Sequence, residues 1–122
     1  MQATKTARTI ITSQSLAAGA GAVTGTWNGT TSLAALLTAR ITNGATGPTI
    51  GCTVTVNVSN DNSTWRKLTA VTAGTSNNEI DDFAFVIPDA TMYVQVSIGG
   101  NTGQAVTIEA LLHELTSVGV NA

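Results

Sequence analysis

Residues 50–59 read IGCTVTVNVS, and the apolar side chains of this stretch occupy every second position. These apolar residues are Ile50, Cys52, Val54, Val56 and Val58. Because successive side chains of a β-strand point to opposite faces, a strand here has one apolar face and one polar face. On a helix the same residues would be scattered around the axis. The stretch therefore predicts an antiparallel strand whose apolar face is buried.

The same alternation recurs along much of the chain. It is found in residues 33–41, 83–87, 92–98 and 106–112, with weaker strand patterns at 9–12 and 65–71. Asn, Asp, Gly and Pro separate these stretches and favour turns. Residues 33–39 (LAALLTA) also have helix propensity, so both structures are open there. About seven strands without a helical pattern between them predict an all-β fold, an antiparallel β-sandwich of Ig-like or jelly-roll type.

The chain length of 122 residues suits one domain. Residues 1–15 are mostly small and polar, and we expect an N-terminal arm over 1–15 followed by a single β-sandwich domain over 16–122. Residues 116–122 have a similar composition. Extended segments of this kind can add a strand to the sheet edge of a neighbouring subunit. The arm and the tail therefore predict contacts between copies of the chain or with another protein.

Charged residues are scarce and argue against several partners. They make up 10% of the chain, against about a quarter in average proteins. The net charge is -2 with only five basic residues, so no positive field is available to hold a phosphate backbone, and we expect no nucleic-acid partner. No stretch approaches the roughly 20 apolar residues of a membrane span, and we expect no membrane contact. A surface with so few charges lets copies pack closely without repulsion.

Cysteine and histidine, two residue types that often carry catalysis, each occur once in the chain. Cys52 is the only cysteine and lies on the apolar side of its strand, which indicates a small buried side chain and not a reactive thiol. His113 is the only histidine, and Glu109 and Glu114 alone do not complete an acid–base or metal site around it. We therefore expect no enzymatic activity, with no catalytic, cofactor-binding or metal-binding residues and no cofactor.

An acidic cluster follows residue 78. It consists of Glu79, Asp81, Asp82 and Asp89. Carboxylates combined with loop carbonyls can hold calcium, but the spacing of an EF-hand is absent. We expect a solvated loop here.

Residues 59–65 read SNDNSTW and resemble the Ser-x-Asp-x-Gly-x-Thr-Trp hairpin, the Asp-box, of sialidases and many other β-proteins. Ser59, Asp61, Thr64 and Trp65 match that pattern in type, although the segment is shorter and lacks the glycine. The resemblance implies a structural role, in which the aspartate ties down the turn and the tryptophan packs beneath it. It implies no catalysis.

Three aromatic residues suggest a second kind of function. Trp27, Trp65 and Tyr93 would form a platform for sugar rings if they lay together on the surface. This arrangement would favour a tail or fibre-associated component with a carbohydrate- or receptor-binding role.

Residues 33–115 are similar to small β-sandwich structural proteins of tailed-bacteriophage virions. The similarity is carried by NDNSTW, by residues 88–112 (PDATMYVQVSIGGNTGQAVTIEALL) and by the Thr/Ala/Gly-rich composition. It implies a capsid decoration or cement protein that stabilises the head, or a tail or fibre component. The implied partners are other virion proteins, above all the major capsid protein, and copies of the chain in a homo-oligomer.

The resemblance also implies location in the virion after synthesis in the host cytoplasm, which agrees with the lack of a recognisable signal peptide at the start of the sequence. Candidate contact residues are those of the expected arm and two of the aromatic residues: Lys5, Arg8, Ile10, Ile11, Trp65 and Tyr93.

Overall fold

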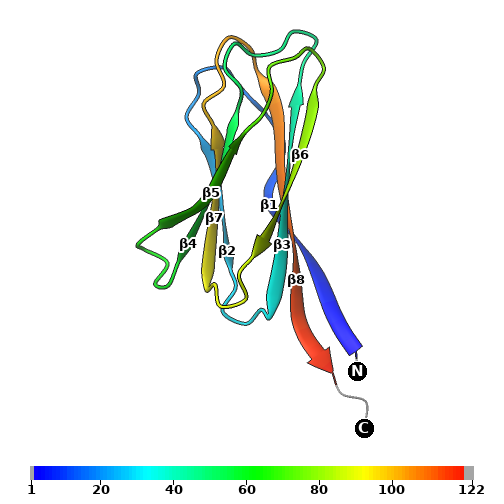
Figure 1. Ribbon diagram of the computed structural model, residues 1–122, viewed down its shortest axis with the longest axis vertical. Coiled ribbons are helices and arrows are strands. Elements are labelled where there is room, and N and C mark those ends of the chain that lie inside the picture. The colour runs from blue at the N-terminus through cyan, green and yellow to red at the C-terminus, as the bar shows by residue number, and fades with distance from the viewer. Residues whose placement is uncertain (1, 120–122) are drawn as a thin grey trace.

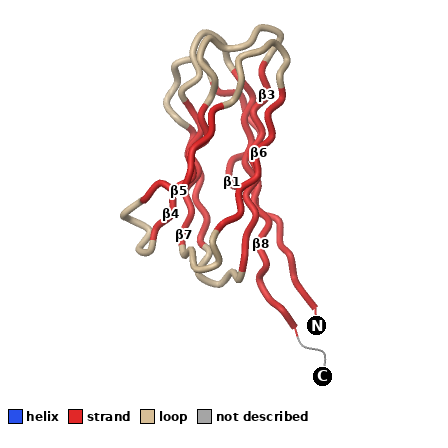
Figure 2. The backbone as a smooth tube through the Cα atoms, viewed as in Figure 1, coloured by secondary structure: helices blue, strands red, loops and turns tan. Residues whose placement is uncertain are grey.

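The computed structural model describes residues 2–119 and consists of strands joined by loops, without a helix in that range (Figures 1 and 2). The strands are β1 (Gln2–Leu16), β2 (Val23–Asn28), β3 (Ala34–Asn43), β4 (Thr53–Ser59), β5 (Arg66–Thr72), β6 (Ile80–Ile87), β7 (Tyr93–Gly99) and β8 (Val106–Gly119). The predicted all-β class is confirmed, with eight strands in place of about seven.

The strands form two antiparallel four-stranded sheets that pack face to face (Figure 1). Sheet A has the order β1-β8-β3-β6, and sheet B has the order β2-β7-β4-β5. The pairs β1–β8, β2–β7, β3–β6 and β4–β5 are nested, as if one long hairpin had been rolled up. This nesting is the connectivity of a jelly roll, and it decides between the two sandwich types that the sequence left open.

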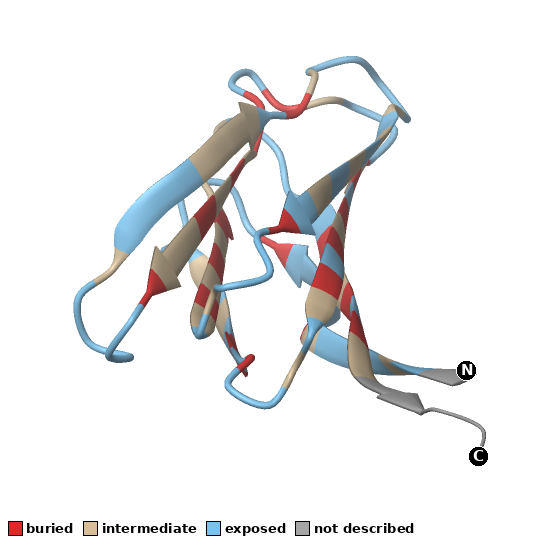
Figure 3. Ribbon diagram, turned by 60° about the horizontal axis from the view of Figure 1, so that its bottom comes forward, coloured by how far each residue is buried: buried red, intermediate tan, exposed pale blue. Residues whose placement is uncertain are grey.

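The core lies between the sheets and is built from the alternating apolar residues (Figure 3). Cys52, Val54 and Val56 are fully buried, as the alternation predicts. Val58 is only half-buried, and the expectation for Ile50 is wrong because its side chain is 57% exposed. β4 begins at Thr53, and Ile50 lies before it in an isolated bridge to Thr102, where the chain has not yet entered the sheet.

Residues 34–43 are a strand despite the helix propensity of their first half. β3 lies between β8 and β6, and its alternate side chains Ala35, Leu37, Ala39 and Ile41 are buried. Pairing on both sides and burial of this face outweigh a propensity of a few tenths of a kcal/mol per residue.

The first and last strands differ from the expected arm and tail. Residues 2–16 form β1, which pairs with β8 from Gln2–Gly119 to Leu16–Val106. Residues 116–119 of the expected tail belong to β8, while Met1 and residues 120–122 lie outside the described residues. The reason is that the arm finds its partner strand within its own chain. Beyond Leu115, which pairs with the first residue of β3, the two strands continue as a ribbon that projects from the sandwich (Figure 1).

Candidate functional site

A buried carboxylate closes the end of the sandwich from which the ribbon projects. Glu114 on β8 is 5% exposed and accepts a hydrogen bond from Trp27 Nε1 at 2.6 Å. Arg8 on β1 donates to its other carboxylate oxygen through Nε at 3.2 Å and Nη2 at 3.1 Å. These bonds connect β1 and β8 of sheet A with β2 of sheet B. The three residues satisfy one another, so the cluster is suited to holding the sheets together.

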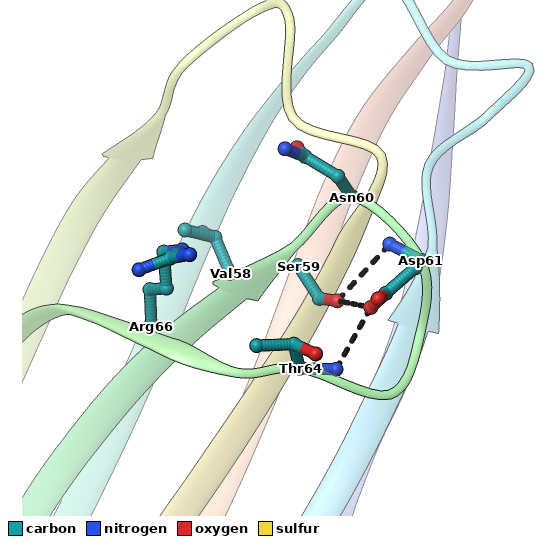
Figure 4. A pocket seen from close by; sticks show the side chains of 6 residues that line it. All are labelled: Val58, Ser59, Asn60, Asp61, Thr64 and Arg66. Carbon is teal, nitrogen blue, oxygen red and sulfur yellow. Dashed lines mark hydrogen bonds between the residues drawn. The ribbon is translucent and has the colours of Figure 1, made fainter.

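The hairpin between β4 and β5 is organised by Asp61 (Figure 4). Its Oδ1 accepts hydrogen bonds from the backbone N–H groups of Ser63 at 2.9 Å and Thr64 at 2.8 Å, and from the Ser59 hydroxyl at 2.8 Å. Asn62 has a φ of 60°, in the left-handed region that asparagine tolerates. This is the role that the Asp-box resemblance implies for the aspartate. Trp65, the last residue of the motif, is half-buried.

These bonds lower the pKa of the Asp61 carboxyl. The largest contribution comes from the backbone N–H of Thr64, followed by those of Ser63 and the Ser59 hydroxyl, all of which favour the charged form. The carboxylate is exposed, and its acceptor capacity serves the turn. The hydrogen bonds of Asp61 are therefore used to tie down the turn.

The acidic residues that could have held calcium serve the loop between β5 and β6. Asp81 accepts a hydrogen bond from the Gly74 N–H at 2.9 Å, and Glu79 accepts one from the Ser76 N–H at 3.3 Å. Asn43 donates to the carbonyls of the same two loop residues, at 3.1 and 2.9 Å. Among residues 2–119, no three His, Cys, Asp or Glu side chains gather closely enough to hold a metal ion.

The outer face of sheet B is polar and contains Tyr93. The tyrosine is half-buried at the start of β7 and pairs with Asn28 on one side and Ser59 on the other. Next along this face, Asn57 donates to the Gln95 side-chain oxygen at 3.2 Å. Hydroxyl and amide groups beside an aromatic ring could receive a polar, ring-containing ligand.

The three aromatic residues do not form one platform. Trp27 is 8% exposed and points into the core, where it is bound to Glu114. Tyr93 lies on sheet B, and Trp65 lies at the end of the β4–β5 hairpin. Tyr93 and Trp65 are therefore the aromatic candidates that retain some surface.

The outer face of sheet A carries apolar side chains around a shallow hollow of about 430 Å³. Its lining includes Leu36, Val86, His113 and Lys5. Val86 is 79% exposed and Leu36 is 41% exposed. Next to it, the exposed pair Arg40–Asp82 has Nε and Oδ1 2.7 Å apart; the hydrogen bond raises the pKa of Arg40 and lowers that of Asp82. This face therefore combines exposed apolar side chains with a few charged ones, among them Lys5, Arg40, Asp82 and Glu109.

Of the remaining arm residues, Ile10 and Ile11 face their own subunit and Lys5 does not. Ile11 is buried in the core and Ile10 is half-buried against it, while Lys5 is exposed beside the hollow on sheet A. Contacts of Ile10 and Ile11 with a neighbour would therefore require β1 to leave its sheet.

The single cysteine and the single histidine lie in different surroundings. Cys52 is buried, and burial raises the pKa of its thiol to about 11, which keeps it protonated and unreactive at neutral pH. His113 is exposed on the outer face of sheet A. Within residues 2–119 no helix is long and apolar enough to cross a membrane.

No family model and no curated protein sequence matches the chain. Solved structures with a similar fold do exist. The K3 cleaved adhesin domain of Lys-gingipain from Porphyromonas gingivalis w83 has a TM-score of 0.59 at 12% identity, over 83% of this chain and 72% of that one. A chain of the T13 infectious bursal disease virus particle has a TM-score of 0.57 at 12% identity, over 92% of this chain and 31% of that one.

A subunit of the disulfide-linked pili of Bacillus endospore appendages has a TM-score of 0.51 at 14% identity, over 97% of this chain and 93% of that one. At these identities the likeness concerns the fold alone. The chain is a small all-β protein whose structural neighbours include a viral particle, a bacterial appendage and an adhesin.

The role of Glu114 in connecting the two sheets was not predicted from the sequence. The residue continues the inward-facing series Val106, Ile108, Ala110 and Leu112, and its position in that series places its carboxylate between the sheets. A charge on the apolar side of a strand requires hydrogen-bond or charged partners, here the buried Trp27 and the exposed Arg8.

Proposed function

We propose that this protein is a structural component of a tailed-bacteriophage virion, a decoration or cement protein that stabilises the capsid as a homo-oligomer. Its partners would be the major capsid protein and copies of itself, and its role would be non-catalytic. The virion assignment rests on the sequence resemblance, and the jelly-roll body is compatible with it. The geometry supports an assembly role through one observation, the ribbon formed by β1 and β8.

The ribbon supports assembly because it is incomplete as a sheet. β8 has β3 as a partner up to Leu115 and then only β1 for residues 116–119. A two-stranded ribbon alone in water is marginally stable, and its open edge offers backbone groups to a further strand. A capsid protein strand that pairs with this edge would fix the ribbon by β-augmentation. Many such contacts around a shell would add up through avidity.

The test is binding of the purified protein to undecorated capsid shells, followed by heating of the shells. We expect the intact protein to bind at fixed stoichiometry and to raise the temperature at which the shells open. A variant that lacks residues 1–4 loses one strand of the ribbon but keeps Arg8 and its bond to Glu114. It should fold, as judged by circular dichroism, and bind with lower occupancy.

Ile50→Ser is the matched control, because this exposed side chain lies at the other end of the sandwich. It should bind like the intact protein. Failure of the intact protein to bind shells would exclude the cement assignment. Full binding and protection by the truncated variant would remove the ribbon from the mechanism.

A second candidate function is a tail or fibre component that binds a carbohydrate or receptor. The observation in its favour is Tyr93 on the outer face of sheet B, next to the Asn57–Gln95 amide pair. Glycan-array binding that is lost in Tyr93→Ala or Trp65→Ala and kept in Ile50→Ser would favour this function. An array without a binding glycan would count against it.

A further inference from the structure

Each sheet ends in two outer strands, and three of these four edges are protected. The register of β1 is interrupted at several points, and the strand carries Lys5 and Arg8. β2 is short and is covered by β1, since a Cβ at Gly25 would overlap the Ile10 carbonyl oxygen. The register of β5 with β4 is interrupted, and β5 begins with Arg66 and Lys67. Irregularity, charged side chains and cover are the usual means of blocking edge-to-edge pairing.

The fourth edge, β6, is regular and has no cationic side chain, and its charged residues are two aspartates, Asp81 and Asp82. Its register with β3 is continuous from Ala35–Ile87 to Thr42–Ile80. The sequence of the strand, IDDFAFVI, contains no Lys, Arg, Gly or Pro. Its two charges are engaged within the subunit, Asp81 by the Gly74 N–H and Asp82 by Arg40. β6 is thus a regular, uninterrupted edge whose two carboxylates already accept hydrogen bonds within the subunit.

Backbone groups of β6 are available for pairing. The Asn43 N–H donates to the Glu79 carbonyl, which makes positions 43 and 79 a hydrogen-bonded pair. Because hydrogen-bonded and non-hydrogen-bonded pairs alternate along antiparallel strands, the odd-numbered residues of β6 bond to β3. The N–H and C=O groups of the even-numbered residues therefore point to the open edge: Ile80, Asp82, Ala84 and Val86.

Apart from Asp81 on one face and Asp82 on the other, the side chains of β6 are apolar on both faces of the strand. Phe83, Phe85 and Ile87 point toward the core, and both phenylalanines remain half-buried. On the outer face, Val86 is 79% exposed and Ile80 is 56% exposed. A strand that is apolar on both faces is typical of one that is covered by further protein.

We propose that β6 of one copy pairs antiparallel with β6 of a second copy across a twofold axis, joining the two A sheets into one continuous sheet. The inference rests on the proposed function for its setting and deepens it by naming the interface between copies. Across a twofold axis, residues of the same face lie opposite one another only in those registers in which one residue of β6 lies opposite its own copy.

The charges select one of these registers. With Phe83 opposite its own copy, Ile80 faces Val86 and Asp82 faces Ala84, so the exposed apolar side chains cover each other. A shift in one direction would place Asp82 opposite Asp82, and like charges directly opposite are destabilising. A shift in the other direction would place Asp82 opposite Val86 and leave Ile80 without a strand partner. The Phe83-centred register also lets the two phenylalanine rings meet.

Sedimentation of the full chain over a range of concentrations tests the proposal. We expect a monomer–dimer equilibrium in the wild type, and a dissociation constant raised by at least about tenfold in Val86→Lys, because a lysine on the edge opposes pairing. The matched control is Ile50→Lys, an exposed isoleucine away from β6 that should dimerise like the wild type. A wild type that stays monomeric, or Val86→Lys that dimerises equally well, would overturn the proposal.

Disulfide trapping tests the register. The opposed Cα atoms of a hydrogen-bonded pair lie about 5.5 Å apart, within the range that a disulfide spans. The double variant Ile80→Cys/Val86→Cys should form covalent dimers on mild oxidation, while each single variant should not. Equal cross-linking of a single variant would overturn this register. Dimers that fail to bind capsid shells would refute the proposed function and leave the β6 interface in place, because self-association needs no shell.

Discussion

β7 and β6 are both regular strands, but their apolar side chains are distributed differently between the two faces of the strand. In β7, in the middle of sheet B, Val94, Val96 and Ile98 point inward and are at most 1% exposed, while Tyr93, Gln95 and Ser97 point outward. In β6, at the edge of sheet A, apolar residues lie on both faces. β7 thus has one buried apolar face, whereas β6 leaves apolar side chains exposed at the edge of its sheet, which is the surface that the proposed pairing would cover.

The largest expected effect compares the same substitution in the two strands. Val96→Asp places an unpaired charge in the core and should destabilise the fold by about 3–5 kcal/mol, a large part of the roughly 5–15 kcal/mol available to a domain. Val86→Asp changes an exposed side chain and should alter the free energy of unfolding of the monomer by less than about 0.5 kcal/mol. Urea denaturation of both variants at low concentration measures the difference. Similar losses would mean that the faces are assigned wrongly.

How far the sequence predicts this molecule follows from the same comparison. The middle strands β7 and β8 could be predicted because one buried face imposes the alternation of Val94, Val96 and Ile98 and of Val106, Ile108 and Ala110. Their pairing could not, because alternation says which face is buried and not which strand lies alongside. The nested jelly-roll order therefore appears only in three dimensions.

The ends and edges of the molecule were the least predictable. Ile50 continues the apolar alternation of its stretch but lies before β4 begins. The alternation in the sequence therefore extends beyond the residues that belong to the sheet. The small, polar residues of β1 gave only a weak strand signal, because this strand is held by pairing with β8 and not by a fully apolar face. The roles of Lys5, Arg8, Ile10, Ile11, Trp65 and Tyr93 as contact residues remain predictions.

A smaller effect is expected where the two sheets are joined by the buried Glu114. Trp27→Phe keeps the aromatic ring but removes the N–H that donates to Glu114, leaving one oxygen of a buried carboxylate without its partner. The expected loss is about 1–3 kcal/mol. Thermal unfolding followed by far-UV circular dichroism measures it. Trp65→Phe, at a half-buried position in the β4–β5 hairpin, should change stability little; an equal loss would contradict the special role of Trp27.

The smallest expected effect concerns Asp61 and depends on pH. Because the pKa of this carboxyl is lowered in the folded state, its charged form stabilises the fold at pH values above its ordinary pKa of about 3.9. This contribution is lost as the pH falls below that value toward the lowered folded pKa. Asp61→Asn should therefore lower the melting temperature slightly at pH 7, and the difference from the wild type should shrink toward pH 2.

The control for this effect is Asp89→Asn, an exposed carboxylate to which the described residues donate no hydrogen bond. Its melting temperature should follow the wild type at both pH values. A difference between Asp61→Asn and the wild type that stays constant from pH 7 to pH 2 would show that the charge of Asp61 does not support the hairpin.

Amide hydrogen exchange of β6 tests most directly the claim that the open edge of this strand pairs with β6 of a second copy. The N–H groups of Phe83 and Phe85 bond to β3 and should be protected at every protein concentration, which makes them an internal reference. The N–H groups of Ile80, Asp82, Ala84 and Val86 should exchange rapidly in dilute protein and become protected as the concentration rises. Rapid exchange of these four amides at all concentrations would contradict the claim.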